Sequence, residues 1–330
     1  MQTWILSLML VLPLHAQNAP EAAAPIDRLR TNIEQIARSV DTNWGIYIKC
    51  LDTNEEIAIN ADRVMDTMSV IKIPVLVELF RQVDAGHLNL DKRIVLQTEH
   101  KRFGTGVLST LDDGSSLTLR DAAMLMIIQS DNSATDLCFD AVGGPEVVNA
   151  CMRSLGLTQI QATGTCFNWF RAMATEMDPT FARLSPGELF RRGNPVLPPL
   201  EAALIREQFH FDGKHPFGLS SARAMGRLLE MIYRAECASD QSCAEMLRIL
   251  RLQQFRTRIP KYLFGTTTPH KTGDFGPFIA NDVGFVEPYQ RTPVLVCFFN
   301  RHHRGIWANL EDAVARMSEK VWEYALRGEN

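Results

Sequence analysis

Hydrophobic residues recur at helical spacing in some stretches of the chain and at strand spacing in others. An apolar stripe over residues 26–40 has the three- and four-residue spacing of an amphipathic helix. Residues 44–51 and 56–60 are rich in β-forming side chains, and a polar turn at residues 52–54 separates them. This pattern predicts a helix followed by a β-hairpin.

The middle of the chain is predicted to be mainly helical. One helix should start at Ser69 and end near Asp84, and a capping box from Thr118 to Asp121 should open another, strongly apolar helix. Further helices are expected at residues 132–141, 145–155, 221–234 and 242–252. Residues 158–218 contain six prolines and little sustained periodicity, which predicts an irregular segment.

Strand patterns return near the end of the chain. Residues 270–273, 282–286 and 293–300 should be strands, and residues 310–325 carry the apolar stripe of a last helix. Because strands lie at both ends of the chain, they must pair across the helical middle. The predicted fold is an α/β protein of the α+β sandwich type. We expect an antiparallel sheet of about five strands formed by both chain ends and flanked by helices, an all-helical lobe, and an active site between them.

The chain opens with a short apolar run that ends in small and turn-forming residues, as is typical of a secretory signal peptide. The run is shorter than the roughly 20 apolar residues of a membrane span. We therefore expect export to the periplasm or beyond, without a stable membrane span. No Lys or Arg lies near Met1, so an uncleaved anchor stays open as an alternative.

The expected organisation is a signal, a linker and one domain. The signal covers residues 1–16, the linker residues 17–25 and a single domain residues 26–330. Within this domain, residues 26–63 and about 255–330 form the α/β part. Residues from about 64 to 254 form the helical part, which contains an irregular insertion at 168–218.

Composition narrows the possible partners. A net charge of −4 with interspersed signs gives no basic surface for nucleic acid, so no nucleic-acid partner is expected. No C-x-x-C or paired His/Cys spacing suggests a metal, and His302-His303 is more typical of a solvated strand end, so no metal site or cofactor is predicted. Of the seven cysteines, Cys237 and Cys243 could come together across a polar connection.

Ser69 and Lys72 are the first candidates for chemistry. Their spacing places both side chains on one helical face, where a partly desolvated lysine could take the proton of an attacking serine. Such a pair alone is more often a helix cap followed by a solvated lysine. Two further motifs change this interpretation, namely Ser130-Asp131-Asn132 and Lys271-Thr272-Gly273.

In this order, the three motifs resemble the S-x-x-K, S-D-N and K-T-G set of penicillin-recognising serine enzymes, and the sequence around the first two is similar to class A β-lactamases. The resemblance implies a catalytic domain in which Ser69 is acylated, Lys72 takes its proton and Ser130 protonates the departing nitrogen. It also implies an oxyanion hole formed by the backbone N–H groups of Ser69 and Asp274. The implied substrate-binding residues are Asn132, Lys271, Thr272 and Gly273. Lys271 should in addition lower the pKa of Lys72 by like-charge repulsion.

One departure concerns deacylation. Class A enzymes use a glutamate in a loop after the S-D-N helix, and here Cys166 stands at the corresponding place. Glu176 or Glu188 could replace it, although each is more typical of a solvated loop carboxylate.

Three functions stay open. They are β-lactam hydrolysis, D-Ala-D-Ala peptidase action on peptidoglycan stem peptides, and a binding or sensing role with almost no turnover. The substrate would be a small β-lactam or a stem peptide, and the protein is expected to be a monomer.

Overall fold

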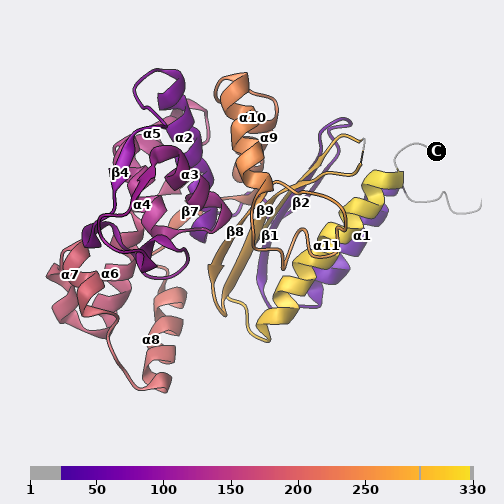
Figure 1. Cartoon of the computed structure of the whole chain (residues 1–330). Coiled ribbons are helices and arrows are strands. Elements are labelled where there is room, and N and C mark those ends of the chain that lie inside the picture. Colours follow the sequence, from indigo (N-terminus) through magenta and orange to yellow (C-terminus); the bar gives the residue numbers. More distant parts are fainter. Residues whose placement is uncertain (1–23, 290, 328–330) are drawn as a thin grey trace, which may run out of the picture.

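A computed structural model of the chain describes residues 24–289 and 291–327, and its central element is a five-stranded sheet. The strand order is β2-β1-β10-β9-β8, and every neighbouring pair is antiparallel (Figure 1). The strands are β1 (Asn43–Cys50), β2 (Glu56–Ile59), β8 (His270–Phe275), β9 (Ile279–Val286) and β10 (Val294–Arg301). Both ends of the chain share this sheet, so the predicted fold class is confirmed.

Helices from opposite ends of the chain cover one face of the sheet. α1 (Pro25–Arg38) and α11 (Trp307–Arg327) lie side by side there (Figure 1). They pack against strand residues such as Ile46 and Ile48, whereas Tyr47, between those two in sequence, belongs to the core on the opposite face. Both faces of β1 are therefore buried, because side chains of a strand alternate in direction.

The opposite face packs against α9 (Ala222–Tyr233), which joins the sheet to the helical lobe. A β-carbon on Gly226 would lie 2.5 Å from the ring of Tyr47, so glycine allows α9 its close approach. Other helices of this lobe are α2 (Lys72–Asp84), α3 (Leu119–Ile128), α4 (Asn132–Val142), α5 (Pro145–Ser154) and α10 (Asp240–Arg251), with 3-10 turns at Met68–Ile71, Thr98–His100 and Leu108–Thr110. The predicted capping box of α3 is confirmed, with Thr118 and Asp121 bonded to each other's backbone.

The lobe also contains strands, so the expectation that it is all-helical is wrong. β3 (Met65–Asp66), β7 (Gly218–Ser220) and β6 (Gln161–Ala162) form one small sheet, and β4 (Arg93–Val95) pairs with β5 (Ser116–Thr118). These strands are two or three residues long, and this is too short for an alternating pattern to be recognised in the sequence.

The expected irregular insertion at residues 168–218 is wrong as well. That region is mainly helical, with α6 (Cys166–Met177), a 3-10 turn at Pro179–Arg183, α7 (Pro186–Arg192) and α8 (Pro199–Asp212). Pro179, Pro186 and Pro199 are the first residues of three of these elements. Proline is tolerated there because the first N–H groups of a helix have no partner within it.

The predicted signal, residues 1–16, lies outside the described residues. None of the helices in the described ranges 24–289 and 291–327 has the length and hydrophobicity needed to cross a bilayer.

Cys237 and Cys243 are buried free thiols with their Sγ atoms 3.9 Å apart, so they lie close together without a disulfide bond.

Candidate active site

Ser69 lies in the 3-10 turn that precedes α2, not in the α-helix where the sequence placed it. The preceding residue, Met68, has a left-handed backbone with φ of +46°, which is unfavourable for a residue with a side chain. Its N–H donates to Oδ1 of Asp66 at 2.9 Å, which holds the turn in this conformation. The half-buried Ser69 faces a cavity of about 210 Å³.

Strand β8 passes directly against this turn. A β-carbon on Gly273 would lie 2.4 Å from the carbonyl oxygen of Thr67 and 3.1 Å from the nitrogen of Ser69. Glycine therefore permits the close backbone approach that the sequence indicated. The approach brings the N–H of Ser69 near the segment that carries Asp274, which also lines the cavity, so the proposed oxyanion hole is compatible with this geometry.

The three motifs meet at the side chain of Ser130. Nζ of Lys72 donates to Oγ of Ser130 at 3.1 Å, to its carbonyl at 2.7 Å and to Oδ1 of Asn132 at 2.8 Å. Nζ of Lys271 donates to the same hydroxyl at 3.0 Å and to the carbonyl of Thr272 at 2.7 Å. Two lysines, one from α2 and one from β8, therefore contact one serine.

Both lysines are fully buried. Burial lowers the pKa of Lys72, because a charged ammonium loses its hydration. It also lowers the pKa of Lys271 to well below its usual range, and the neighbouring ammonium of Lys72 adds to that effect. The expected direction for Lys72 is thus confirmed, but burial is the main cause, and the like-charge repulsion acts on Lys271.

The S-D-N residues have structural tasks as well as their place in the cavity. Asp131 caps α4 through a bond from the N–H of Ala134 at 2.9 Å, and its other oxygen accepts from two N–H groups of the preceding loop. The amide of Asn132 donates to the carbonyl of Phe103 at 2.8 Å while its oxygen accepts from Lys72. The loop and α4 are thereby fixed around the two lysines.

Cys166 adjoins the same cluster, as the sequence indicated for the position of the missing glutamate. Its Sγ is 3.7 Å from Oδ1 of Asn132, and its N–H donates to Asp136 at 2.7 Å. Burial and the nearby carboxylate of Asp136 raise the pKa of the Cys166 thiol well above its usual range. The side chain at this position is therefore a neutral thiol at physiological pH.

Neither alternative carboxylate lies among the residues around Ser69. Glu188 caps α7 by accepting from Ser185, and Glu176 lies 3.6 Å from Nε2 of His215. The more ordinary interpretation of both side chains, as loop or cap carboxylates, fits the structure.

Sequence reasoning missed Asp136 and its partner Arg102. Their ion pair is buried, with an Nε–Oδ2 distance of 2.5 Å, and Asp136 also accepts from the N–H groups of Cys166 and Phe167. This carboxylate connects α4 to the start of α6. The signal was available, because Asp136 follows Asn132 by four residues and so shares its helical face.

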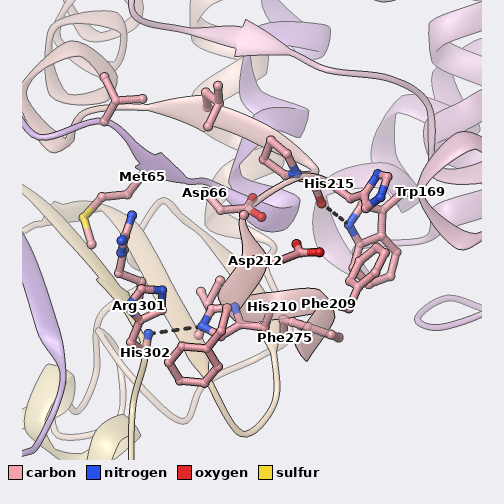
Figure 2. A pocket seen from close by; sticks show the side chains of 16 residues that line it. Met65, Asp66, Trp169, Phe209, His210, Asp212, His215, Phe275, Arg301 and His302 are labelled. Atoms are coloured by element: carbon pink, nitrogen blue, oxygen red, sulfur yellow. Dashed lines mark hydrogen bonds between the residues drawn. The ribbon is translucent and has the colours of Figure 1, made fainter. Parts of the chain in front are cut away.

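The far wall of the cavity is aromatic. The space above Ser69 is lined by three residues of α6, namely Trp169, Phe170 and Met173. Arg206 of α8, Phe217, and Phe275 of β8 complete this wall. A second cavity of about 290 Å³ lies behind Trp169 and Phe275, and Figure 2 shows Arg301 and His302 across it from Trp169.

The end of α8 is docked on the sheet at this second cavity. The ring of His210 stacks on Phe278 with a centroid distance of 4.8 Å, and its Nε2 accepts from the N–H of His302 at 3.2 Å. His302 is half-buried and His303 is buried, so the expected solvated strand-end pair is wrong. No group of three or more His, Cys, Asp or Glu side chains in the described part of the chain could hold a metal ion.

Comparison with known proteins identifies the family. Residues 28–325 match the model of the β-lactamase enzyme family, and the chain belongs to that family. It is 28% identical over 152 residues to β-lactamase L2 of Stenotrophomonas maltophilia, covering 44% of this chain and 50% of that protein. The alignments with curated relatives such as this one span about half of the relatives' length.

Solved structures extend the similarity to the whole fold. The crystal structure of a β-lactamase from Sphaerobacter thermophilus superposes with a TM-score of 0.71 at 26% identity, covering 92% of this chain and 99% of the other. PBP-A has the same fold, with a TM-score of 0.67 at 23% identity over 90% of this chain and 95% of its own.

Proposed function

We propose that this protein is a serine β-lactamase of the class A type that hydrolyses β-lactams through an acyl-enzyme on Ser69. The observation that carries the proposal is the shared hydroxyl of Ser130, which two buried lysines contact next to Ser69. In this arrangement Lys72, whose pKa is lowered, takes the proton of Ser69 during attack. Ser130 then relays a proton to the departing lactam nitrogen.

The remaining roles follow the same geometry. The N–H groups of Ser69 and Asp274 would stabilise the oxyanion, and Asn132 would hold the acylamino group of the substrate. Lys271 and Thr272 would hold a substrate carboxylate. Gly273 would let β8 pack closely against the backbone of the Ser69 turn, which brings the two oxyanion-hole segments together.

Deacylation is expected to be the slow half of the reaction. Cys166 presents a thiol where class A enzymes carry a carboxylate, and a protonated thiol is a poor base for activating water. Because of the thiol at this position, two alternative functions stay open: a D-Ala-D-Ala peptidase, and a protein that is acylated but releases the acyl group very slowly. A point mutant of PBP-A, which has the same fold, was solved as an acyl-enzyme complex with penicillin G.

The deciding experiment combines turnover and intact mass. The purified protein is mixed with a chromogenic cephalosporin, and product formation and the mass of the protein are followed together. We expect repeated turnover with a slow phase after the first equivalent, and loss of both signals in Ser69→Ala. A single stoichiometric burst with a stable adduct would exclude hydrolysis as the function, and release of D-alanine from a stem peptide would favour the peptidase.

We further propose that the protein works as an exported monomer, in the periplasm or outside the cell. Support comes from the apolar run at residues 1–16 and from the location of peptidoglycan and of incoming β-lactams. Mass measurement of the N-terminus after expression with an export pathway tests cleavage after Ala16.

A further inference from the structure

Arg206 of α8 brings a positive charge into the Ser69 cavity that the proposed reaction does not use. Its side chain is exposed and lines the cavity together with Ser69 and Asn132. In the part of the chain that the structure describes, no carboxylate lies within ion-pairing distance of its guanidinium. The catalytic scheme therefore leaves an arginine in the substrate site without a counter-charge or a role.

Contacts with the end of β8 hold this guanidinium at the cavity. One N–H group of Arg206 donates to the carbonyl of Gly276 at 3.0 Å, and its Cζ lies 5.4 Å from the centre of the Phe275 ring. Arg206 precedes His210 by four residues, so both side chains lie on the face of α8 that is docked on the sheet. The bond to Gly276 uses a single N–H, and the remaining donors of the guanidinium are free to bind a ligand.

Asp274 also lines the cavity, but it does not neutralise Arg206. Its carboxylate is bound by the buried guanidinium of Arg258, which in turn pairs with Glu311 at 3.1 Å. Side chains alternate in direction along a strand, so Asp274 points away from the face on which Phe275 contacts Arg206. The charged cluster of Arg258, Asp274 and Glu311 is therefore separate from the guanidinium of Arg206.

The place of Arg206 along β8 indicates which part of a substrate it would meet. Lys271, which would hold the carboxylate beside the lactam nitrogen, lies at the start of the strand, whereas Gly276 directly follows its end. A strand rises about 3.3 Å per residue, so these two residues are on the order of 15 Å apart. Arg206 is thus far from the lactam carboxylate and would face the acyl side chain of the substrate, whose amide Asn132 would hold.

We propose that Arg206 forms an anion-binding subsite for the acyl side chain, so that the Ser69 site favours lactams whose acyl side chain carries a carboxylate. This inference rests on the proposed function and names the substrate class within it. A carboxylate on that side chain would accept charge-assisted hydrogen bonds from the free donors of Arg206. The carboxylate beside the lactam nitrogen would still bind at Lys271, so the two anionic groups of such a lactam would bind at separate places.

The test compares two penicillins that differ in one carboxylate. Carbenicillin is benzylpenicillin with a carboxylate added to the acyl side chain. The second-order rate constant for acylation of Ser69 is measured by intact mass for both, and the ratio of carbenicillin to benzylpenicillin is compared between the wild type and Arg206→Gln. We expect this ratio to fall about fivefold in the variant, which is the effect of losing one exposed, hydrogen-bonded ion pair. Added salt should lower the ratio in the wild type and have a smaller effect in the variant.

The controls separate charge from folding and from overall charge. Glutamine keeps an N–H donor for the carbonyl of Gly276, and Arg206→Ala serves as a second uncharged variant if thermal melting shows that Arg206→Gln is unstable. Arg206→Lys keeps the positive charge and should retain most of the wild-type ratio. Arg227→Gln removes an exposed arginine of α9 and should leave the ratio unchanged.

The outcomes distinguish this inference from the proposed function. If benzylpenicillin acylates the wild type but carbenicillin does not, or if the ratio is the same in the wild type and the uncharged variants at Arg206, the anion-binding subsite is wrong while the proposed function stands. If neither penicillin acylates Ser69 in the wild type, the proposed function itself is wrong.

Discussion

The two walls of the Ser69 cavity differ in what they can do chemically. On the wall built by α2, α4 and β8, the hydroxyl of Ser130 lies within hydrogen-bond distance of both Lys72 and Lys271, and Lys72 also reaches Asn132. The wall built by α6 and α8 presents aromatic rings, Met173 and an exposed arginine, with the Cys166 thiol buried at its base. One wall can move protons, whereas the other mainly shapes the space.

This difference separates the two halves of the proposed reaction. Acylation needs a base beside Ser69 and a proton donor for the leaving nitrogen, and the polar wall supplies both. Deacylation needs a base that faces an incoming water molecule from the other side, and there the structure has a thiol with a raised pKa. Substitutions on the two walls should therefore affect different rate constants.

The largest effect is expected on the polar wall. Lys72→Met keeps a buried side chain of similar length but removes the base, so acylation of Ser69 by benzylpenicillin should slow by about a thousandfold. The measurement is the rate of adduct formation by intact mass, with Lys92→Met at an exposed position as the control. A variant that is acylated at the wild-type rate would show that another group takes the serine proton.

A smaller effect is expected on the aromatic wall. Cys166→Glu supplies a carboxylate beside Asn132 and should raise the deacylation rate by about a hundredfold, because it adds a general base. The rate of adduct loss after removal of free lactam measures it. Cys166→Gln has nearly the same shape without the charge and is the matched control. Equal deacylation in both variants would contradict the role assigned to this position.

The smallest effect concerns the docking of α8. Burial, together with the charges of His302 and Arg301, lowers the pKa of His210 to about 4. Between pH 6.5 and 4 the unfolded chain therefore binds a proton that the folded protein does not, and stability falls as the pH falls. We expect a loss on the order of 1 kcal/mol from this group, discounted for its partial exposure.

Urea unfolding at about pH 7 and about pH 5, on either side of the ordinary histidine pKa, measures this pH dependence. His210→Gln, which keeps an acceptor for the N–H of His302, should reduce the difference between the two pH values. His87→Gln changes an exposed histidine and should leave it unaltered. An identical pH dependence in wild type and His210→Gln would mean that α8 does not respond to this histidine.

The sequence predicted the polar wall well because its motifs are short and local. Ser130 and Asn132 adjoin one capping residue, and Lys271 to Gly273 lie on one strand, so a few residue types specify both position and chemistry. The terminal helices and strands were also predictable, since their apolar faces are long enough to show a period.

The sequence was a poor guide to the aromatic wall and the charged cluster. In the sequence, the prolines at the starts of α7 and α8 indicate irregular structure as readily as helix starts, because the same residue begins helices and interrupts them. The contact of Arg258 with Asp274 and Glu311 joins residues up to 53 positions apart, and such a contact depends on the packing of the whole sheet.

The bond from Asp136 to the start of α6 also determines how reactive Cys166 is. A cysteine at the first turn of a helix, close to a lysine, would ordinarily be a strong nucleophile, because the positive end of the helix dipole stabilises its thiolate. Here the first two N–H groups of α6 are occupied by the carboxylate of Asp136, so that positive end is already neutralised. The Cys166 thiol should therefore resist alkylating reagents, and a covalent inhibitor directed at this cavity would have to act through the serine.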